Sequence, residues 1–374
     1  MANNNENKVL KVPHLRFPEF TEEWVNVSLK DVADFQKERI SSGLLDESTY
    51  ISTENILQNF QGVQSAISIP ANTNVVAYKK NDILLSNIRP YLKKAWFSDR
   101  IGGCSADVFV LRSKTCEPEF LYNVIASDKF INYVMSGAKG VKMPRGDKNQ
   151  MESFSFSIPA VVEQRKISRL FQLLDERIVT QNKIIEDLKK LKSAISERLL
   201  KGVKGSTVLL SDICDIVKGK QINGENLSES GNYYVMNGGT ELSGYYDDYN
   251  VEANTISISE GGNSCGYVQF NTSPFWSGGH CYSIQDITDN VDNLYLYHYL
   301  KSKEDAIMKL RIGSGLPNIQ KKDLAMFKIK IPAVEQQLKI STFLSSLERK
   351  AEIEERIQNA LLKEKQYLLH QMFI

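Results

Sequence analysis

The sequence lacks the features of membrane, secreted and disulfide-rich proteins. Its 374 residues contain no apolar run near the ~20 residues that a membrane-spanning helix needs. The polar start, MANNNENK, has no apolar core of a signal peptide. We therefore expect a cytoplasmic protein with a leader over residues 1–20 and no membrane partner. The five cysteines show no C-x-x-C spacing, which predicts reduced, partly buried thiols.

Signatures of catalysis are also missing. The sequence has no G-x-x-x-x-G-K-[ST] loop and no Asn/Asp-Pro-Pro-aromatic motif of an amino-methyltransferase. GGNSCG, residues 261–266, opens no helix after a strand and predicts a tight turn. His280 and Cys281, in GGHC, are too few ligands to indicate zinc. We therefore expect a recognition or scaffold protein with no catalytic and no metal-binding residues of its own.

Positive charge is absent from one long segment. The net charge of +1 gives no global basic field that would attract nucleic acid. Between Lys220 and Lys301 there is no Lys or Arg at all. A partner of this segment must therefore be held by neutral donors, neutral acceptors and aromatic side chains.

What the sequence does have is an internal repeat. IPAVVEQRKIS, residues 158–168, returns as IPAVEQQLKIS, residues 331–341, a shift of 173 residues. VSLKDVADFQK, from Val27, resembles VLLSDICDIVK, from Val208, at a shift of 181. The interior of the second repeat is therefore eight residues shorter. A period this long indicates duplicated domains rather than a solenoid.

The repeated segments predict a strand that leads into a long helix. FSFSIP and FKIKIP alternate apolar and polar residues, and the proline ends the strand. The helical pattern that follows each extends over roughly 40 residues, or about 60 Å. A helix this long with one apolar stripe needs a partner, so we expect the two helices to pair, rather than each to pack only on its own domain. The predicted interface residues are Ile167, Phe171, Leu174, Ile178, Ile185, Leu188, Ile195, Leu199, Ile340, Leu344, Leu347, Ile357, Leu361 and Leu368.

The predicted fold class is α+β. Two globular α/β domains form a tandem repeat, each is followed by a long α-helix, and the helices pair as an antiparallel coiled coil with pseudo-two-fold symmetry. The predicted segments are the leader at 1–20, the first globular domain at 21–159, the first long helix at 160–203, the second globular domain at 204–332 and the second long helix at 333–374.

Loops of both globular domains carry residues suited to nucleic acid. Arg reads guanine edges, Asn reads adenine edges, and Lys neutralises phosphates, although a solvated loop is the alternative for any one loop. Two such loops in the first domain favour DNA. The candidate DNA-binding residues are Asn87, Arg89, Tyr91, Lys93, Lys94, Lys142, Arg145 and Lys148 in the first domain, and Asn263, Ser264, Trp276, Asn318, Gln320, Lys321 and Lys322 in the second.

Over nearly its whole length the sequence resembles the specificity subunits of type I restriction–modification systems. The resemblance rests on VPHLRFPEFTEEW before VSLKDVADF, on DILLSNIRPYLKKAWFSD, on TISISEGGNSCGYVQF with FWSGGHCYSI, and on the repeated IPAV phrase. It implies two target recognition domains that each read one half of a bipartite double-stranded DNA sequence. It also implies that the helix pair sets the gap between the half-sites.

The resemblance further implies partners, and a role in DNA methylation and phage defence. Two methyltransferase subunits would bind S-adenosylmethionine and dock on the helices, and two motor–nuclease subunits would use ATP and Mg²⁺. This chain would hold no cofactor and catalyse neither reaction. The competing hypotheses are a stand-alone DNA-binding regulator and a coiled-coil protein scaffold.

Overall fold

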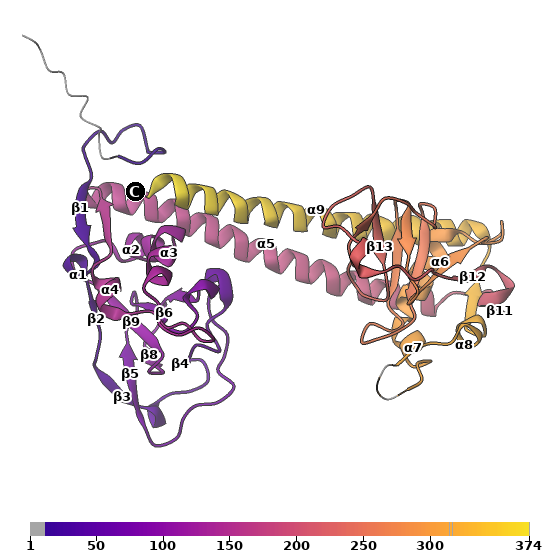
Figure 1. Cartoon of the computed structure of the whole chain (residues 1–374), viewed down its shortest axis with the longest axis horizontal. Coiled ribbons are helices and arrows are strands. Elements are labelled where there is room, and N and C mark those ends of the chain that lie inside the picture. The colour runs from indigo at the N-terminus through magenta and orange to yellow at the C-terminus, as the bar shows by residue number, and fades with distance from the viewer. Residues whose placement is uncertain (1–11, 314, 316, 374) are drawn as a thin grey trace, which may run out of the picture. The chain divides into compact units, whose positions relative to one another are not determined.

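The computed structural model describes residues 12–313, 315 and 317–373, so most of the leader predicted at 1–20 lies outside the described residues. The chain divides into two compact units (Figure 1). Unit 1 comprises Met1–Gln181 and Ile357–Ile374, and unit 2 comprises Asn182–Arg356. Each unit therefore holds one globular domain together with a part of each long helix.

The globular domain of unit 1 contains a two-stranded sheet, β1-β10, and two four-stranded sheets, in the orders β2-β9-β6-β7 and β3-β5-β8-β4. The strands are β1 (Val25–Ser28), β2 (Ala33–Phe35), β3 (Arg39–Ser41), β4 (Tyr50–Ile51), β5 (Asn74–Tyr78), β6 (Ile83–Ser86), β7 (Ala95–Phe97), β8 (Gly102–Cys104), β9 (Val108–Ser113) and β10 (Ser155–Ile158). The short helices are α1 (Leu29–Val32), α2 (Pro118–Ile125), α3 (Asp128–Ser136) and α4 (Lys148–Glu152).

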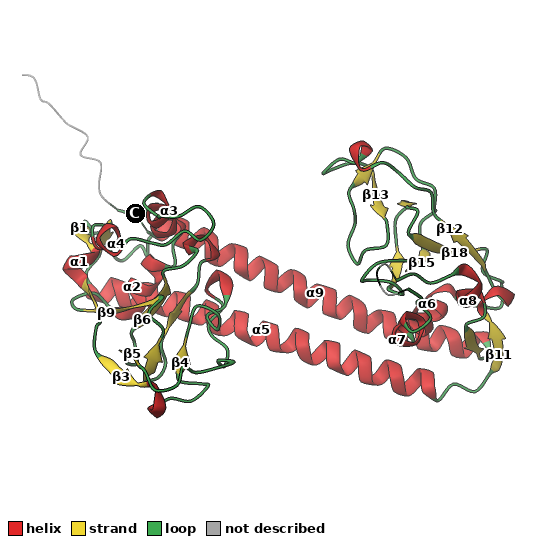
Figure 2. Cartoon of the chain, turned by 60° about the horizontal axis from the view of Figure 1, so that its bottom comes forward, coloured by secondary structure: helices red, strands yellow, loops and turns green. Residues whose placement is uncertain are grey.

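The globular domain of unit 2 contains the sheets β11-β19, β12-β18-β15-β16 and β14-β13-β17 (Figure 2). The strands are β11 (Ser206–Leu209), β12 (Asp215–Lys218), β13 (Tyr233–Met236), β14 (Tyr245–Tyr246), β15 (Thr255–Ser259), β16 (Val268–Asn271), β17 (Phe275–Ser277), β18 (Cys281–Gln285) and β19 (Lys328–Ile331). The short helices are α6 (Asn293–Ser302), α7 (Glu304–Met308) and α8 (Lys321–Ala325).

The two domains share one sheet topology from β6 onward. Ile83 pairs with Leu111 between β6 and β9, and Ile256 pairs with Ile284 between β15 and β18, at a constant shift of 173 residues. The preceding strands also correspond, because β4 lies parallel to β8 as β13 lies parallel to β17. The antiparallel pair of Tyr78 with Gly102 likewise matches the bridge of Val251 with Phe275. The eight-residue difference in length therefore lies before β6 and β15, and the later interior keeps a common register.

The repeated IPAV phrase forms a joint between strand and helix. β1 pairs with β10 and β11 pairs with β19, which explains why similar residues occur at both ends of each domain. Gln164 is buried, donates to the carbonyl of Pro159 and accepts from the amide of Glu117. Gln337, the equivalent residue, donates to the carbonyl of Pro332 and accepts from an amide just before α6. Each glutamine thus fixes the start of a long helix against its own domain.

The long helices α5 (Val161–Lys201) and α9 (Val334–Met372) lie side by side and antiparallel (Figures 1 and 2). In unit 1, Asp175 of α5 pairs with Lys365 of α9 at 2.5 Å. In unit 2, Lys192 of α5 pairs with Glu348 of α9. These two ion pairs are equivalent under the 173-residue shift, which gives the helix pair the predicted pseudo-two-fold pattern. No helix in the described part of the chain combines the length and apolar character needed to cross a membrane.

The predicted helix interface is only partly buried. Five of its residues are buried and seven are half-buried: Ile167, Phe171, Ile185, Ile340 and Leu344 in the first group, and Leu174, Ile178, Leu188, Ile195, Leu347, Leu361 and Leu368 in the second. The prediction is wrong at Leu199 and Ile357, which are 36% and 38% exposed. Leu200 is buried in place of Leu199, within the core of the second domain. The helix ends therefore also pack into the globular domains, because Ile167 and Phe171 belong to the core of the first.

The five cysteines are free and buried, as the sequence predicts: Cys104, Cys116, Cys214, Cys265 and Cys281. Burial raises the pKa of Cys281 to about 11. A thiol in this state carries little thiolate at neutral pH, so it is a poor nucleophile.

Candidate nucleic-acid interface

Three segments of the first domain meet at one point. The amide of Asn87 donates to the carbonyl of Asp107 at 3.0 Å, and the amide of Gly146 donates to the carbonyl of Asn87 at 2.9 Å. The amide of Arg89 donates to the carbonyl of Pro144 at 2.7 Å. The two basic loops predicted from the sequence are therefore brought together, and the turn between β8 and β9 joins them.

The second domain repeats this backbone arrangement. The amide of Glu260 donates to the carbonyl of His280 at 2.9 Å, and the amide of Ile319 donates to the carbonyl of Glu260 at 2.8 Å. The amide of Gly262 donates to the carbonyl of Pro317 at 3.0 Å. Each of these residues lies 173 positions after its counterpart in the first domain. The two candidate interfaces therefore share a backbone framework and differ in their side chains.

Two cationic residues of the first domain occupy backbone positions that suit glycine. Arg89 and Lys93 have φ of 49° and 53°, and their counterparts Gly262 and Gly266 have φ of 76° and 92°. For a residue with a Cβ, a left-handed backbone conformation is about 1–2 kcal/mol less stable than a right-handed one. Strain of this kind persists where a side chain has a use, and both of these side chains are positively charged.

Some predicted phosphate-binding lysines are engaged within the domain. Lys93 forms an ion pair with Asp128 at 2.5 Å, and the ammonium of Lys94 donates to the carbonyl of Thr53 at 2.6 Å. Lys148 forms an ion pair with a glutamate one turn later in α4 and lies over the ring of Phe35. These contacts stabilise the fold, so the lysines are less available to DNA than the sequence alone indicates.

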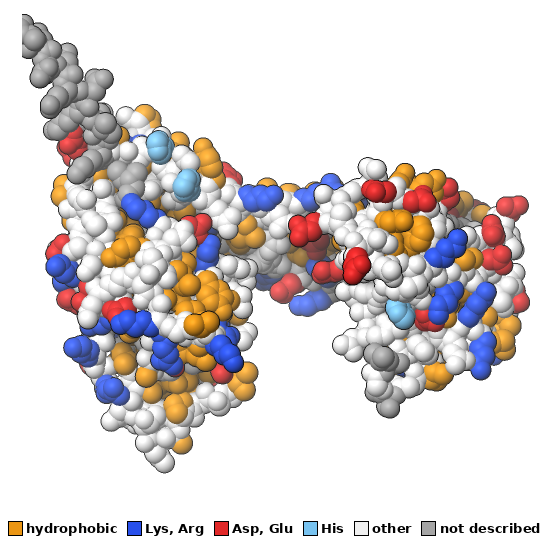
Figure 3. Space-filling view, in the orientation of Figure 1, with side chains coloured by type: hydrophobic (Ala, Val, Ile, Leu, Met, Phe, Trp, Pro, Cys, Tyr) orange, Lys and Arg blue, Asp and Glu red, His pale blue; other side chains and the backbone are white. Residues whose placement is uncertain are grey.

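Four other predicted residues of the first domain are exposed, whereas Asn87 is buried. Arg89, Tyr91 and Lys142 have exposed side chains, and within the described residues neither cation forms an ion pair or side-chain hydrogen bond. Arg145 contacts Asp107 at 2.7 Å, and both side chains are partly exposed. Figure 3 shows Lys and Arg side chains on the drawn face of unit 1.

The second domain offers mostly neutral groups at the equivalent place. Asn263 and Asn318 are exposed, and Ser264 is half-buried. Gln320 is half-buried before α8, and Lys321 and Lys322 are exposed within α8. The only cations that the sequence predicts for this interface therefore lie on a short helix at its flank.

Trp276 has a structural role in the second domain. Its indole N–H donates to the carbonyl of Lys220 at 2.9 Å, and its ring packs edge-on against Tyr246. The ring is half-buried in β17, so only part of it is available for stacking on a base.

Sequence reasoning missed three charged or titratable residues of these interfaces: Asp107, Lys218 and Glu260. Glu260 is buried, and its Oε1 accepts from Lys218 at 2.7 Å and from the hydroxyl of Tyr282 at 3.1 Å. His280, set aside as a zinc ligand, lies 3.9 Å from the other carboxylate oxygen. The 173-residue shift, extended back to residue 86, was the signal that would have aligned Asn87 with Glu260 and Asp107 with His280.

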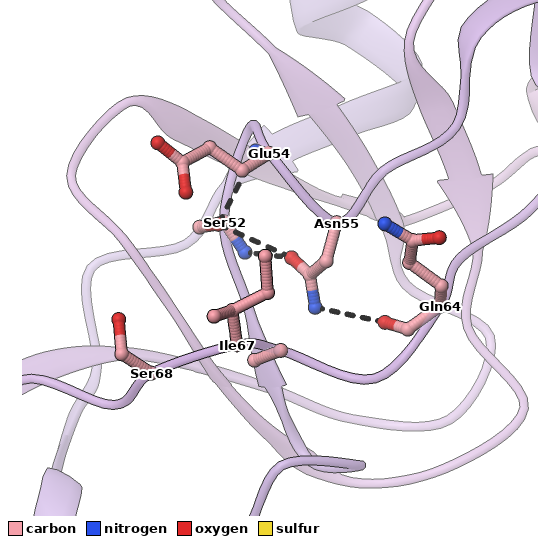
Figure 4. Close-up of a pocket in the computed structure, with 7 residues that line it drawn as sticks. Ser52, Glu54, Asn55, Gln64, Ile67 and Ser68 are labelled. Carbon is pink, nitrogen blue, oxygen red and sulfur yellow. Dashed lines mark hydrogen bonds between the residues drawn. The ribbon is translucent and has the colours of Figure 1, made fainter. Parts of the chain in front are cut away.

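A depression beside the first interface carries no recognition chemistry. Ser52, Glu54, Asn55, Gln64, Ile67 and Ser68 line it (Figure 4). The Asn55 amide donates to the carbonyls of Tyr50 and Gln64, so it closes the loop instead of facing a ligand. Over the described residues, no three His, Cys, Asp or Glu side chains gather as potential metal ligands.

Comparison with known proteins gives matches over most of the chain. A family model described as the type I restriction modification DNA specificity domain matches residues 21–190 and again 203–363. A putative type I specificity subunit of Mycoplasma pneumoniae is 31% identical over 145 residues, which span 38% of each chain. The type I restriction enzyme MjaVIII specificity subunit of Methanocaldococcus jannaschii is 24% identical over 95% of this chain and 92% of that one.

Two solved structures share the fold. The type I restriction–modification S subunit of M. genitalium superposes with a TM-score of 0.69 at 17% identity, over 97% of this chain and 99% of that one. A chain from a study of complex assembly and conformational transition in a type I R–M system gives a TM-score of 0.60 at 19% identity, over 93% and 96%.

Proposed function

We propose, because this chain belongs to the family of type I restriction–modification DNA specificity domains, that it selects the DNA sequence on which a type I system acts. Each globular domain reads one half of a bipartite target. The observation that carries this proposal is the shared loop framework, with Asn87 and Arg145 in the first domain where Glu260 and Asn318 stand in the second. One framework with two sets of side chains suits two unrelated half-sites.

The helix pair sets the gap between the half-sites and docks the methyltransferase subunits. Ion pairs between α5 and α9 prevent one helix from sliding along the other, and this keeps the length of the pair fixed. An open groove on α9 is lined by Leu338 and Phe343, both nearly half exposed, with Glu335, Lys339, Thr342 and Ser346 around them. An exposed apolar strip within a polar rim is typical of a protein–protein contact.

The chemistry belongs to the partner subunits in this proposal. Two methyltransferase subunits bind S-adenosylmethionine, and two motor–nuclease subunits use ATP and Mg²⁺. The chain itself supplies recognition without catalysis, and the complex acts on double-stranded DNA in the cytoplasm.

The test is to map methylated adenines in cells that carry the chain with its methyltransferase subunit. The wild-type complex should methylate one bipartite sequence. Arg89→Ala should alter or weaken only the first half-site, because Arg89 is exposed in the first domain. Arg177→Ala, in an exposed position on α5, is the matched control and should leave both half-sites unchanged. Methylation with no bipartite sequence would refute the proposal.

Co-purification separates the two alternatives. A chain that binds DNA specifically but never retains a methyltransferase would be a stand-alone regulator. A chain that retains protein partners but shows no sequence preference would be a scaffold.

A further inference from the structure

We propose that residues 145 and 318 contact equivalent base pairs in the two half-sites, with Arg145 selecting guanine and Asn318 selecting adenine. The inference rests on the proposed function and deepens it, because it assigns base contacts to single residues. Both residues occupy the same point of the shared framework, 173 positions apart.

The backbone of Arg145 is fixed from two sides. It exchanges hydrogen bonds of 2.9 and 3.0 Å with Lys139 across its own turn. It also forms a bridge with Ile88, in the loop that carries Arg89. A residue held by two neighbouring segments can place its side chain reproducibly, which base recognition requires.

Asn318 is fixed in the same way. It exchanges hydrogen bonds of 3.0 and 2.8 Å with Ile312 and forms a bridge with Gly261. Gly140 and Gly313, in the two turns, also share a left-handed φ of 98° and 97°. The two turns therefore match in hydrogen bonding and in the backbone conformation of this glycine.

The side chains at this point have the chemistry of base readers. One guanidinium nitrogen of Arg145 contacts Asp107 at 2.7 Å, and the side chain remains 52% exposed. A carboxylate that holds one edge of a guanidinium leaves other N–H donors for the O6 and N7 acceptors of guanine. The exposed amide of Asn318 has no side-chain hydrogen bond among the described residues. An amide can both donate to N7 and accept from N6 of adenine.

A second observation points to the same place in both domains. The side-chain oxygens Oδ1 of Asn87 and Oε2 of Glu260 are buried without a hydrogen-bond partner among the described residues. Their backbone carbonyls accept from the residues directly after Arg145 and Asn318. Nδ1 of His280 lies 3.9 Å from the Glu260 oxygen, beyond hydrogen-bond distance. Buried acceptors are normally paired, so an unpaired oxygen at equivalent positions of both domains marks this point of the framework.

The experiment exchanges the two readers in the full complex and maps methylated adenines for each variant. Arg145→Asn should replace or remove a guanine at one position of the first half-site and leave the second unchanged. Asn318→Arg should favour guanine at the equivalent position of the second half-site. Preference for the original base should fall roughly tenfold to a hundredfold, as for the loss of a bidentate contact. Arg177→Ala, in an exposed position on α5, is the control and should change neither sequence.

The outcomes are distinct. If Arg145→Asn lowers methylation at every site but leaves the sequence unchanged, Arg145 contacts phosphate and the inference is wrong. If the two substitutions alter non-equivalent positions of the half-sites, the equivalence is wrong. Thermal unfolding of each variant identifies loss of fold, and Asn318→Arg tests the inference even if Arg145→Asn is unstable. A wild-type complex without a bipartite target would refute the proposed function itself.

Discussion

Lengthening the helix pair by about one turn in both helices should lengthen the gap in the DNA target. We propose inserting four helix-forming residues after Gln181 in α5 and four after Arg356 in α9, where the two units meet along the chain. Four residues add about 6 Å to a helix and turn it by roughly 40° beyond a full rotation. With 3.4 Å per base pair, this length corresponds to about two base pairs.

The positions of the insertions follow from the ion pairs. Asp175 and Lys365 both belong to unit 1, so the paired insertions leave this contact in register. Lys192 with Glu348, and Lys189 with Glu355, are preserved in the same way within unit 2. An insertion in α5 alone would separate contacts that α9 still holds at the original spacing. That single-helix variant should therefore be less stable and should give no uniform longer gap.

Mapping of methylated adenines measures the outcome directly. Both half-sites should keep their sequences, and the gap between them should grow by about two base pairs. A gap that stayed constant in the double-insertion variant, with both half-sites still read, would refute the idea that the helices set the spacing. Loss of all methylation in a well-folded variant would instead place the methyltransferase docking surface at the insertion.

Three further predictions concern stability. Arg16→Ala should lower the free energy of unfolding, measured by urea titration, by about 3 kcal/mol. The carboxylate of Glu163 is only 2% exposed, and the substitution removes its two 2.7 Å contacts with Arg16. Lys192→Glu should destabilise the helix pair by roughly 1–2 kcal/mol through repulsion with Glu348, and adding Glu348→Lys should restore most of the loss; equal destabilisation in the double variant would contradict this pairing. Burial lowers the pKa of His298 to about 4. Between about pH 6.5 and 4 the unfolded chain therefore binds a proton at this histidine that the folded chain does not bind. The free energy of unfolding should fall as the pH drops from about 6.5 to 4, by up to about 3 kcal/mol. His298→Gln should flatten that dependence in thermal unfolding.

The ends of each repeat could be predicted from the sequence because their signals are local. Alternation over FSFSIP and FKIKIP predicts strands, and β10 and β19 are found there. Three-four spacing predicts the long helices, and the ion pairs confirm that they associate antiparallel. The error at Leu199 arises because that end of α5 packs into the second globular domain, where the domain core sets the buried face and Leu200 is buried instead. Nothing in the structure explains the exposure of Ile357, near the middle of α9.

The interface residues were harder to predict because their state depends on partners distant in the sequence. Lys93 is engaged by Asp128, and Lys94 by a carbonyl about forty residues earlier, which no local pattern reveals. Glu260 was missed because a single carboxylate after an apolar strand carries no signal of its own. Only its backbone contacts, which match those of Asn87, identify its place.

The same backbone contacts explain how one scaffold can carry two different readers. The loops of each interface are joined through main-chain groups, as in the bonds of Arg89 with Pro144 and Gly262 with Pro317. Such bonds impose almost no requirement on the side chain, so the residue can be arginine in one domain and glycine in the other. Arg89 and Gly262 both have a left-handed φ, which the framework requires. This conformation is strained for arginine, and we infer that arginine is retained at position 89 because its positive charge is useful. Arg89→Gly should therefore stabilise the first domain slightly or leave it unchanged while weakening DNA binding, whereas Arg89→Ala should weaken binding equally and keep the strain. If Arg89→Gly kept full affinity, the guanidinium would have no part in recognition, and the conformation of Arg89 would be a property of the turn alone.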